Sequence, residues 1–145
     1  MNTQEIKILI NKVESKVYCG TGRKDWSKKE TWEFDHKGSL PVYIVDAISS
    51  YGYNDHEFHI MFYGIQPSGR ALVFIMPHTG EDAFGKGVLP SGKHYSLTVG
   101  RYAEINVVDG FDEGEPCLEV NEFRIISDHE IEEIKAEIKK EGGAA

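Results

Sequence analysis

Acidic side chains gather in the carboxyl-terminal half of the chain, where carboxylates could bind a cation or a basic protein. Residues 104–122 hold seven acids and no base. Calcium-binding loops need a D-x-D-x-D-G spacing that this segment lacks. Because an acidic surface repels nucleic-acid phosphates and attracts basic groups, the segment predicts a surface for a basic protein partner. The predicted partner-binding residues are Asp109, Asp112, Glu113 and Glu115.

A second cluster combines basic and aromatic residues near the amino terminus. Cations that follow phosphates and indoles that stack on bases are the components of a site for single-stranded nucleic acid. The net charge of −8 opposes such a site, so nucleic-acid binding is an alternative prediction. The residues of this alternative site are Arg23, Lys24, Trp26, Lys28, Lys29 and Trp32.

Histidines and arginines provide another alternative, a small-molecule pocket or an active site. Residues 77–94 form a long loop rich in glycine and proline, and loops of this length are often functional. A pocket under this loop would need a few convergent polar groups. The candidates are His59, Arg70, His78, His94 and Arg101.

Other motifs lack residues that their chemistry requires. Gly80–Lys86 matches the G-x4-G-K part of a phosphate-binding loop, but Gly87 replaces the Ser or Thr that would hold magnesium. His56 and His59 do not form H-E-x-x-H, and in a strand they would face opposite sides. The sequence has no G-x-S-x-G motif for a nucleophile. We therefore expect no catalytic residue, metal or cofactor, which favours a binding protein over an enzyme.

The bulk properties are those of a cytoplasmic globular protein. No apolar run has the length that crosses a bilayer, and the first residues lack the layout of a secretory signal. We expect no membrane contact. In a cytoplasmic chain, Cys19 and Cys117 are more often reduced thiols than a disulfide.

Hydrophobic spacing predicts helices at both ends of the chain and strands between them. Ile6, Leu9, Ile10 and Val13 mark one face of a helix. Two apolar runs around Pro67-Ser68-Gly69 predict a hairpin, and we expect it to form the buried centre of a sheet. The predicted elements are a helix over 3–17, strands at 30–36, 40–48, 56–65, 70–76, 95–99, 103–107 and 118–126, an acidic turn at 109–116, and a capped helix from 127 to 141. A slip of the apolar phase between Val120 and Phe123 predicts a bulge in the last strand.

Helices and strands do not alternate along the chain, which argues against a parallel, doubly wound sheet. We expect a single α+β, β-rich domain over residues 1–141 and a flexible tail at 142–145. Its core would be a strongly bent antiparallel sheet or small barrel of six or seven strands, of which an oligonucleotide-binding type of barrel is one version. The first functional prediction is a small acidic protein that binds or inhibits a basic protein partner.

Overall fold

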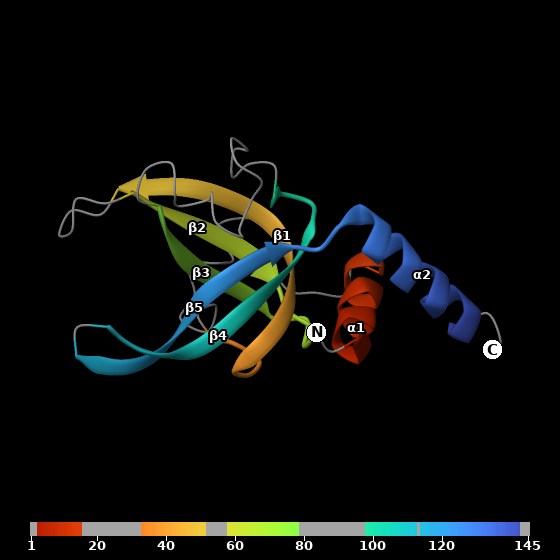
Figure 1. Ribbon diagram of the computed structural model, residues 1–145, viewed down its shortest axis with the longest axis horizontal. Coiled ribbons are helices and arrows are strands. Elements are labelled where there is room, and N and C mark those ends of the chain that lie inside the picture. The colour runs from red at the N-terminus through yellow and green to blue at the C-terminus, as the bar shows by residue number, and fades with distance from the viewer. Residues whose placement is uncertain (1–2, 16–32, 52–57, 79–97, 113, 143–145) are drawn as a thin grey trace.

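The computed structural model describes residues 3–15, 33–51, 58–78, 98–112 and 114–142. One antiparallel sheet of five strands, in the order β3-β2-β1-β4-β5, curls into a half-barrel. Both helices lie on one side of the curled sheet (Figure 1). The elements are α1 (Thr3–Glu14), β1 (Gly38–Tyr51), β2 (Phe58–Ile65), β3 (Ala71–His78), β4 (Tyr102–Asp112), β5 (Glu115–Ile125) and α2 (Asp128–Gly142).

The long strand β1 is the centre of the sheet, and the prediction that the β2–β3 hairpin occupies this place is wrong. The hairpin itself is confirmed, but β3 is the last strand on its side. Residues 38–43 of β1 pair with β4, and residues 43–51 pair with β2. An unpaired extra residue at Val45 marks a bulge, which increases local twist and helps the sheet to curl.

The two apolar faces of the β2–β3 hairpin are buried for different reasons. Phe62 and Phe74 lie on the inner face, in a core that every strand of the half-barrel contributes to. Tyr63 and Val73 lie on the outer face, in a second core with α1 and α2. A strand covered on both faces carries no polar alternation, so its sequence resembles that of a central strand.

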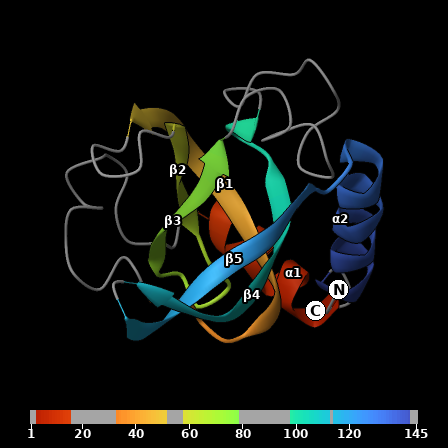
Figure 2. The same cartoon turned by 60° about the vertical axis from the view of Figure 1, so that its left-hand side comes forward.

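Three phenylalanines close the half-barrel from inside. β3 and β5 are the two ends of the sheet, and they lie in contact (Figure 2). Phe62 of β2 stacks on Phe74 and on Phe123 of β5, with ring centroids 5.1 and 4.7 Å apart. Aromatic packing therefore joins β3 to β5, while the described sheet has no ladder of hydrogen bonds between them.

The described chain has five strands instead of six or seven, partly because residues 33–37 do not form a strand. They cross the β2–β3 turn as a strap that side chains hold in place. The side-chain amide of Gln66, which is buried, donates to Glu33 O (2.8 Å) and accepts from the Asp35 amide (2.6 Å). The Asp35 carboxylate in turn accepts from the backbone amide and hydroxyl of Ser68. These bonds replace those of a strand ladder.

Thr98 and Val99, the described part of the predicted strand 95–99, also do not form a strand. Thr98 to Gly100 form a turn, and Gly100 has a φ of 80°, a conformation that favours glycine. The Gly100 amide donates to Ile44 O (2.8 Å), and the Ile44 amide donates to Arg101 O (2.9 Å). The turn is thus fixed against β1 just before its bulge, and β4 begins only at Tyr102.

Two local predictions at the carboxyl-terminal end are confirmed. Asn121 is an extra residue in β5, the bulge expected between Val120 and Phe123. The Ser127 hydroxyl accepts a hydrogen bond from the Glu130 amide (3.1 Å), as an N-cap does, and α2 begins at Asp128. The buried face of α2 carries Ile131 and Ile134, at the spacing expected of a one-sided helix.

Candidate functional site

The β4–β5 hairpin is the candidate site, because it reaches beyond the packed half-barrel at the end away from the helices (Figure 1). Residues 109–116, predicted as an acidic turn, are mostly strand: Asp109 pairs with Leu118 and Asp112 with Glu115. Gly114, with a φ of 83°, lies between the two strands. The described residues of the hairpin tip are therefore held in a regular ladder, which fixes which side chains share a face.

One face of the hairpin tip is apolar. Val107 and Val120 are an opposed pair buried in the inner core. Two residues farther out on each strand, Leu118 lies opposite Asp109, and beyond it Phe111 lies opposite Pro116. Phe111 is 74% exposed and Leu118 is 37% exposed. The apolar stripe thus continues from the core into solvent, which is unusual because large side chains rarely gather on a surface without a partner.

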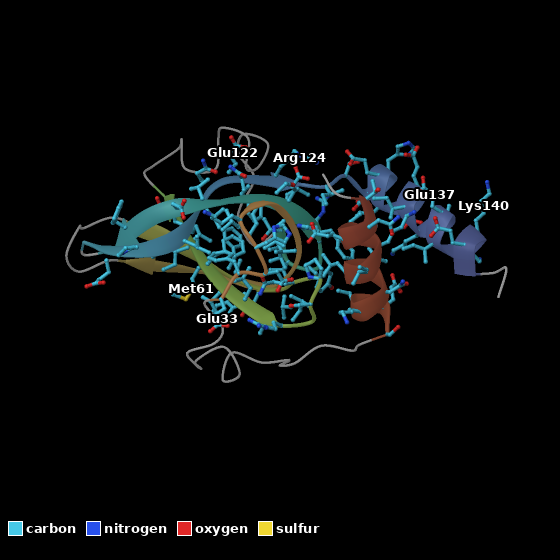
Figure 3. All side chains as sticks on the ribbon, turned by 90° about the horizontal axis from the view of Figure 1, so that it is seen from below. Glu33, Met61, Glu122, Arg124, Glu137 and Lys140 are labelled. Atoms are coloured by element: carbon cyan, nitrogen blue, oxygen red, sulfur yellow. The ribbon has the colours of Figure 1, made fainter. Side chains whose placement is uncertain are left out.

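The other face of the same hairpin is acidic. The ladder places Glu119 opposite Val108 and Glu122 opposite Asn106, and Glu115 lies toward the tip on the same face. The Glu119 side chain lies over Gly110, so closely that a Cβ at position 110 would be 2.3 Å from its carboxyl carbon. Figure 3 shows Glu122 on the outside of the barrel, beside Arg124. We call Glu115, Glu119 and Glu122 the β5 acid row.

The β5 acid row differs from the other carboxylates whose side chains the structure describes in having no partner. Within the described part of the chain, no cation and no hydrogen-bond donor contacts these three carboxylates. Asp35 and Asp46 accept backbone hydrogen bonds. Ion pairs engage Glu5, Glu14, Glu33, Glu104, Asp109, Asp128, Glu130, Glu132, Glu133, Glu137 and Glu141.

The acids predicted from sequence are divided by the structure. Asp109 is on the apolar face, where Lys37 Nζ lies 3.1 Å from its Oδ2. Asp112 and Glu115 are opposed near the tip, and Glu113 lies outside the described residues. Glu119 and Glu122 were missing from the predicted set. The alternation of β5 together with its bulge could have placed them on one face with Glu115.

The basic and aromatic residues of the alternative nucleic-acid site cannot be placed. Arg23, Lys24, Trp26, Lys28, Lys29 and Trp32 all lie outside the described residues. The described strap begins directly after them, at Glu33, and is held to the β2–β3 turn.

The described residues of the alternative pocket are spread over the molecule. Arg70, at the start of β3, pairs with Glu33 (2.8 Å). His78, at the other end of β3, is roughly 25 Å away along the strand, and in the β2–β3 ladder it pairs with Phe58, the residue before His59. Arg101 contacts Asp128 at the start of α2 (3.4 Å), and its buried Nε has no hydrogen-bond partner in the described structure. His94 lies outside the described residues.

Among the described residues, no three His, Cys, Asp or Glu side chains are arranged to hold a metal ion. Cys117 is half-buried on β5 and is not disulfide-bonded, whereas Cys19 lies outside the described ranges. Neither α1 nor α2 is long and apolar enough to cross a bilayer.

Comparison with known proteins gives no relative from which a function could be transferred. Neither the models of protein families nor the sequences of curated proteins contain a match to this chain. The function must therefore be inferred from the geometry of the β4–β5 hairpin.

Proposed function

We propose that this protein binds a protein partner with a basic surface, and that the β4–β5 hairpin is the contact. The observation that carries the proposal is the β5 acid row: among the carboxylates whose side chains the structure describes, those without a partner all lie on one face of one strand. Acids distributed for solubility alone would lie on several elements. A segregated row instead produces a local negative potential, which steers a basic partner to one side of the molecule.

The exposed apolar face supplies the second part of this proposal. Charge complementarity contributes mainly to the rate of association and to specificity, whereas buried aromatic anchors supply most of the binding energy. Phe111 and Leu118 lie on the opposite face of the same two strands as Glu119. A partner that encloses the hairpin tip would therefore contact both an aromatic anchor and the acids.

We further propose that the half-barrel is of the oligonucleotide-binding type. Three consecutive strands and a fourth that returns beside the first form a Greek key, and the described order β3-β2-β1-β4 agrees with it. Barrels of that type have five strands, are partly open, and bind oligonucleotides with the face of strands 2 and 3 and the loops between strands 1 and 2 and between strands 4 and 5.

Two features favour a protein ligand on such a barrel here. The outer face of β2 and β3, with Tyr63 and Val73, is buried in one core with α1. The connection between β4 and β5 is acidic, so it would repel phosphates. Two of the surfaces that an oligonucleotide would use are therefore unfavourable to it.

The proposal is tested by capture with charge-reversed variants. Tagged wild-type protein and a β5 variant (Glu115→Lys, Glu119→Lys, Glu122→Lys) are compared on cell lysate at several salt concentrations. A variant with the same change of charge on exposed positions of α2 (Glu132→Lys, Glu133→Lys, Glu137→Lys) is the matched control. We expect basic proteins that wild type and the α2 variant retain, that salt releases, and that the β5 variant loses.

Two results would contradict the proposal that the β4–β5 hairpin contacts a basic protein. If both variants lose the same proteins, total charge determines capture and the β5 acid row is not the contact. If instead a mixed-sequence single-stranded oligonucleotide quenches tryptophan fluorescence at micromolar concentration and salt reverses the effect, nucleic-acid binding replaces the proposal.

A further inference from the structure

The outer edge of β5 could pair with another strand. β5 is the last strand of the described sheet, and β4 is its one ladder partner among the described residues. Its residues near the hairpin tip are mostly exposed. An exposed edge of this kind is a template for strand addition, and natural proteins often protect it with charges. Pro116 lacks an amide proton and Asn121 is a bulge, so the section that can pair regularly lies between them.

The two faces of the hairpin define what kind of strand would be complementary. A strand added to the edge of β5 would alternate its side chains between the same two faces. On one face its neighbour would be Leu118, which favours an apolar side chain. On the other face its direct neighbour would be Glu119, with Glu115 and Glu122 of the same row at either end of the section, and these acids favour Lys or Arg as partners.

We propose that the occupant of the β5 edge is an extended segment of a partner protein in which basic and apolar residues alternate. This inference rests on the proposed function and adds its mode of binding: main-chain hydrogen bonds to β5 provide affinity, and the two faces provide specificity. The charges also disfavour the simplest competitor, a second copy of this chain. Pairing of β5 with β5 would place acid rows side by side, and opposed like charges destabilise a sheet.

Two synthetic peptides of identical composition test the inference on the full chain. The probe alternates lysine and valine, and the control groups its lysines in one block and its valines in another. Binding is measured by fluorescence anisotropy, and hydrogen exchange is followed for residues 117–120. We expect the alternating peptide to bind at least about tenfold more tightly than the block peptide and to slow exchange in β5, because only it can satisfy both faces along one ladder.

Single substitutions connect the binding to the two faces. Glu119→Gln should weaken the alternating peptide by about two- to fivefold, which corresponds to the loss of one cross-strand pair. Leu118→Ala should weaken it without removing its salt dependence, because the acids remain. Glu132→Gln on α2 removes the same charge at an exposed position and should leave the affinity unchanged.

Two results would overturn strand addition. If both peptides bind equally and exchange in β5 is unchanged, the attraction is only electrostatic: the basic-partner proposal stands and the strand does not form. If neither peptide binds, strand addition is also overturned, whereas the basic-partner proposal is decided separately by the comparison of charge-reversed variants on lysate.

Discussion

The rings of Phe62 and Phe123 stack with their centroids 4.7 Å apart, joining β2 to β5 across the inside of the half-barrel. Both side chains are almost completely buried. The contact is long-range in the sequence, and it holds together two parts of the sheet that are separated by β1 and β4. The curled shape of the sheet, and with it the direction of the β4–β5 hairpin, depends on this aromatic packing.

Phe123→Ala should therefore be among the most destabilising single changes. Removal of a buried phenylalanine costs about 3–5 kcal/mol, because burial is lost and a cavity remains. Urea denaturation followed by circular dichroism measures the loss. Phe111→Ala is the control, since this ring is exposed and should change the free energy of unfolding by no more than about 0.5 kcal/mol. Equal losses in the two variants would contradict the role given to the aromatic core.

Gln66→Leu should detach the strap from the β2–β3 turn. The substitution removes an acceptor from the Asp35 amide and a donor from Glu33 O, and each group left unsatisfied costs about 1–3 kcal/mol if it stays buried. Urea denaturation measures the change, and faster hydrogen exchange at Asp35 localises it. A stable variant with unchanged exchange at Asp35 would show that the strap is held by other contacts.

His36 should make the fold more stable at mildly acidic pH. Hydrogen bonds to the Lys37 carbonyl (2.7 Å) and then to the Glu5 carboxylate (2.6 Å) raise its pKa above the ordinary value of 6.5. A raised pKa in the folded state means that the added stability is fully present below the unfolded pKa and is lost as pH rises through the folded pKa. The ring is partly exposed, so water weakens the effect.

Denaturation of wild type and His36→Gln at about pH 5.5 and about pH 8.5 tests this coupling. The difference in unfolding free energy between the two proteins should be larger at the lower pH. Glu5→Gln should reduce the pH dependence of the wild-type histidine. If the difference between wild type and His36→Gln is the same at both pH values, the contact with Glu5 contributes no proton-linked stability.

Ser127→Ala should destabilise the start of α2. The Ser127 hydroxyl accepts from the Glu130 amide, and removal of an N-cap side chain costs about 1 kcal/mol. Thermal and urea denaturation measure this loss. Ser127→Asp keeps an acceptor at the cap and should retain most of the stability, so two equally destabilised variants would exclude capping as the cause.

Local features of the fold followed from local sequence. The spacing of apolar residues by three and four predicted α1, and Ser127 predicted the start of α2. Pro67-Ser68-Gly69 predicted the β2–β3 turn, in which the Gly69 amide donates to Gln66 O (2.8 Å). The slip of apolar phase in β5 located its bulge at Asn121. These features depend on backbone preferences and hydrogen bonds within a few residues, so the sequence contains the information directly.

Contacts between distant residues decided the remaining features. Phe34 alternates with charged neighbours as a strand residue would, yet its segment is a strap, because Gln66 satisfies the backbone more than thirty residues away. β2 and β3 lie toward one side of the sheet and not at its centre. Their sequences are as apolar as that of a central strand because α1 covers their outer face.

The sequence by itself determined the helices at both ends, the β2–β3 hairpin and an excess of acid over residues 104–122. Only the tertiary structure decided which acids remain unpaired. Lys37 neutralises Asp109 from a distant segment, whereas no described cation forms an ion pair with Glu119 or Glu122, and Arg124 pairs with Glu104 and Glu130 instead. Charge pairing requires two groups within a few ångströms, and the folded strands, not the distance along the chain, set that separation.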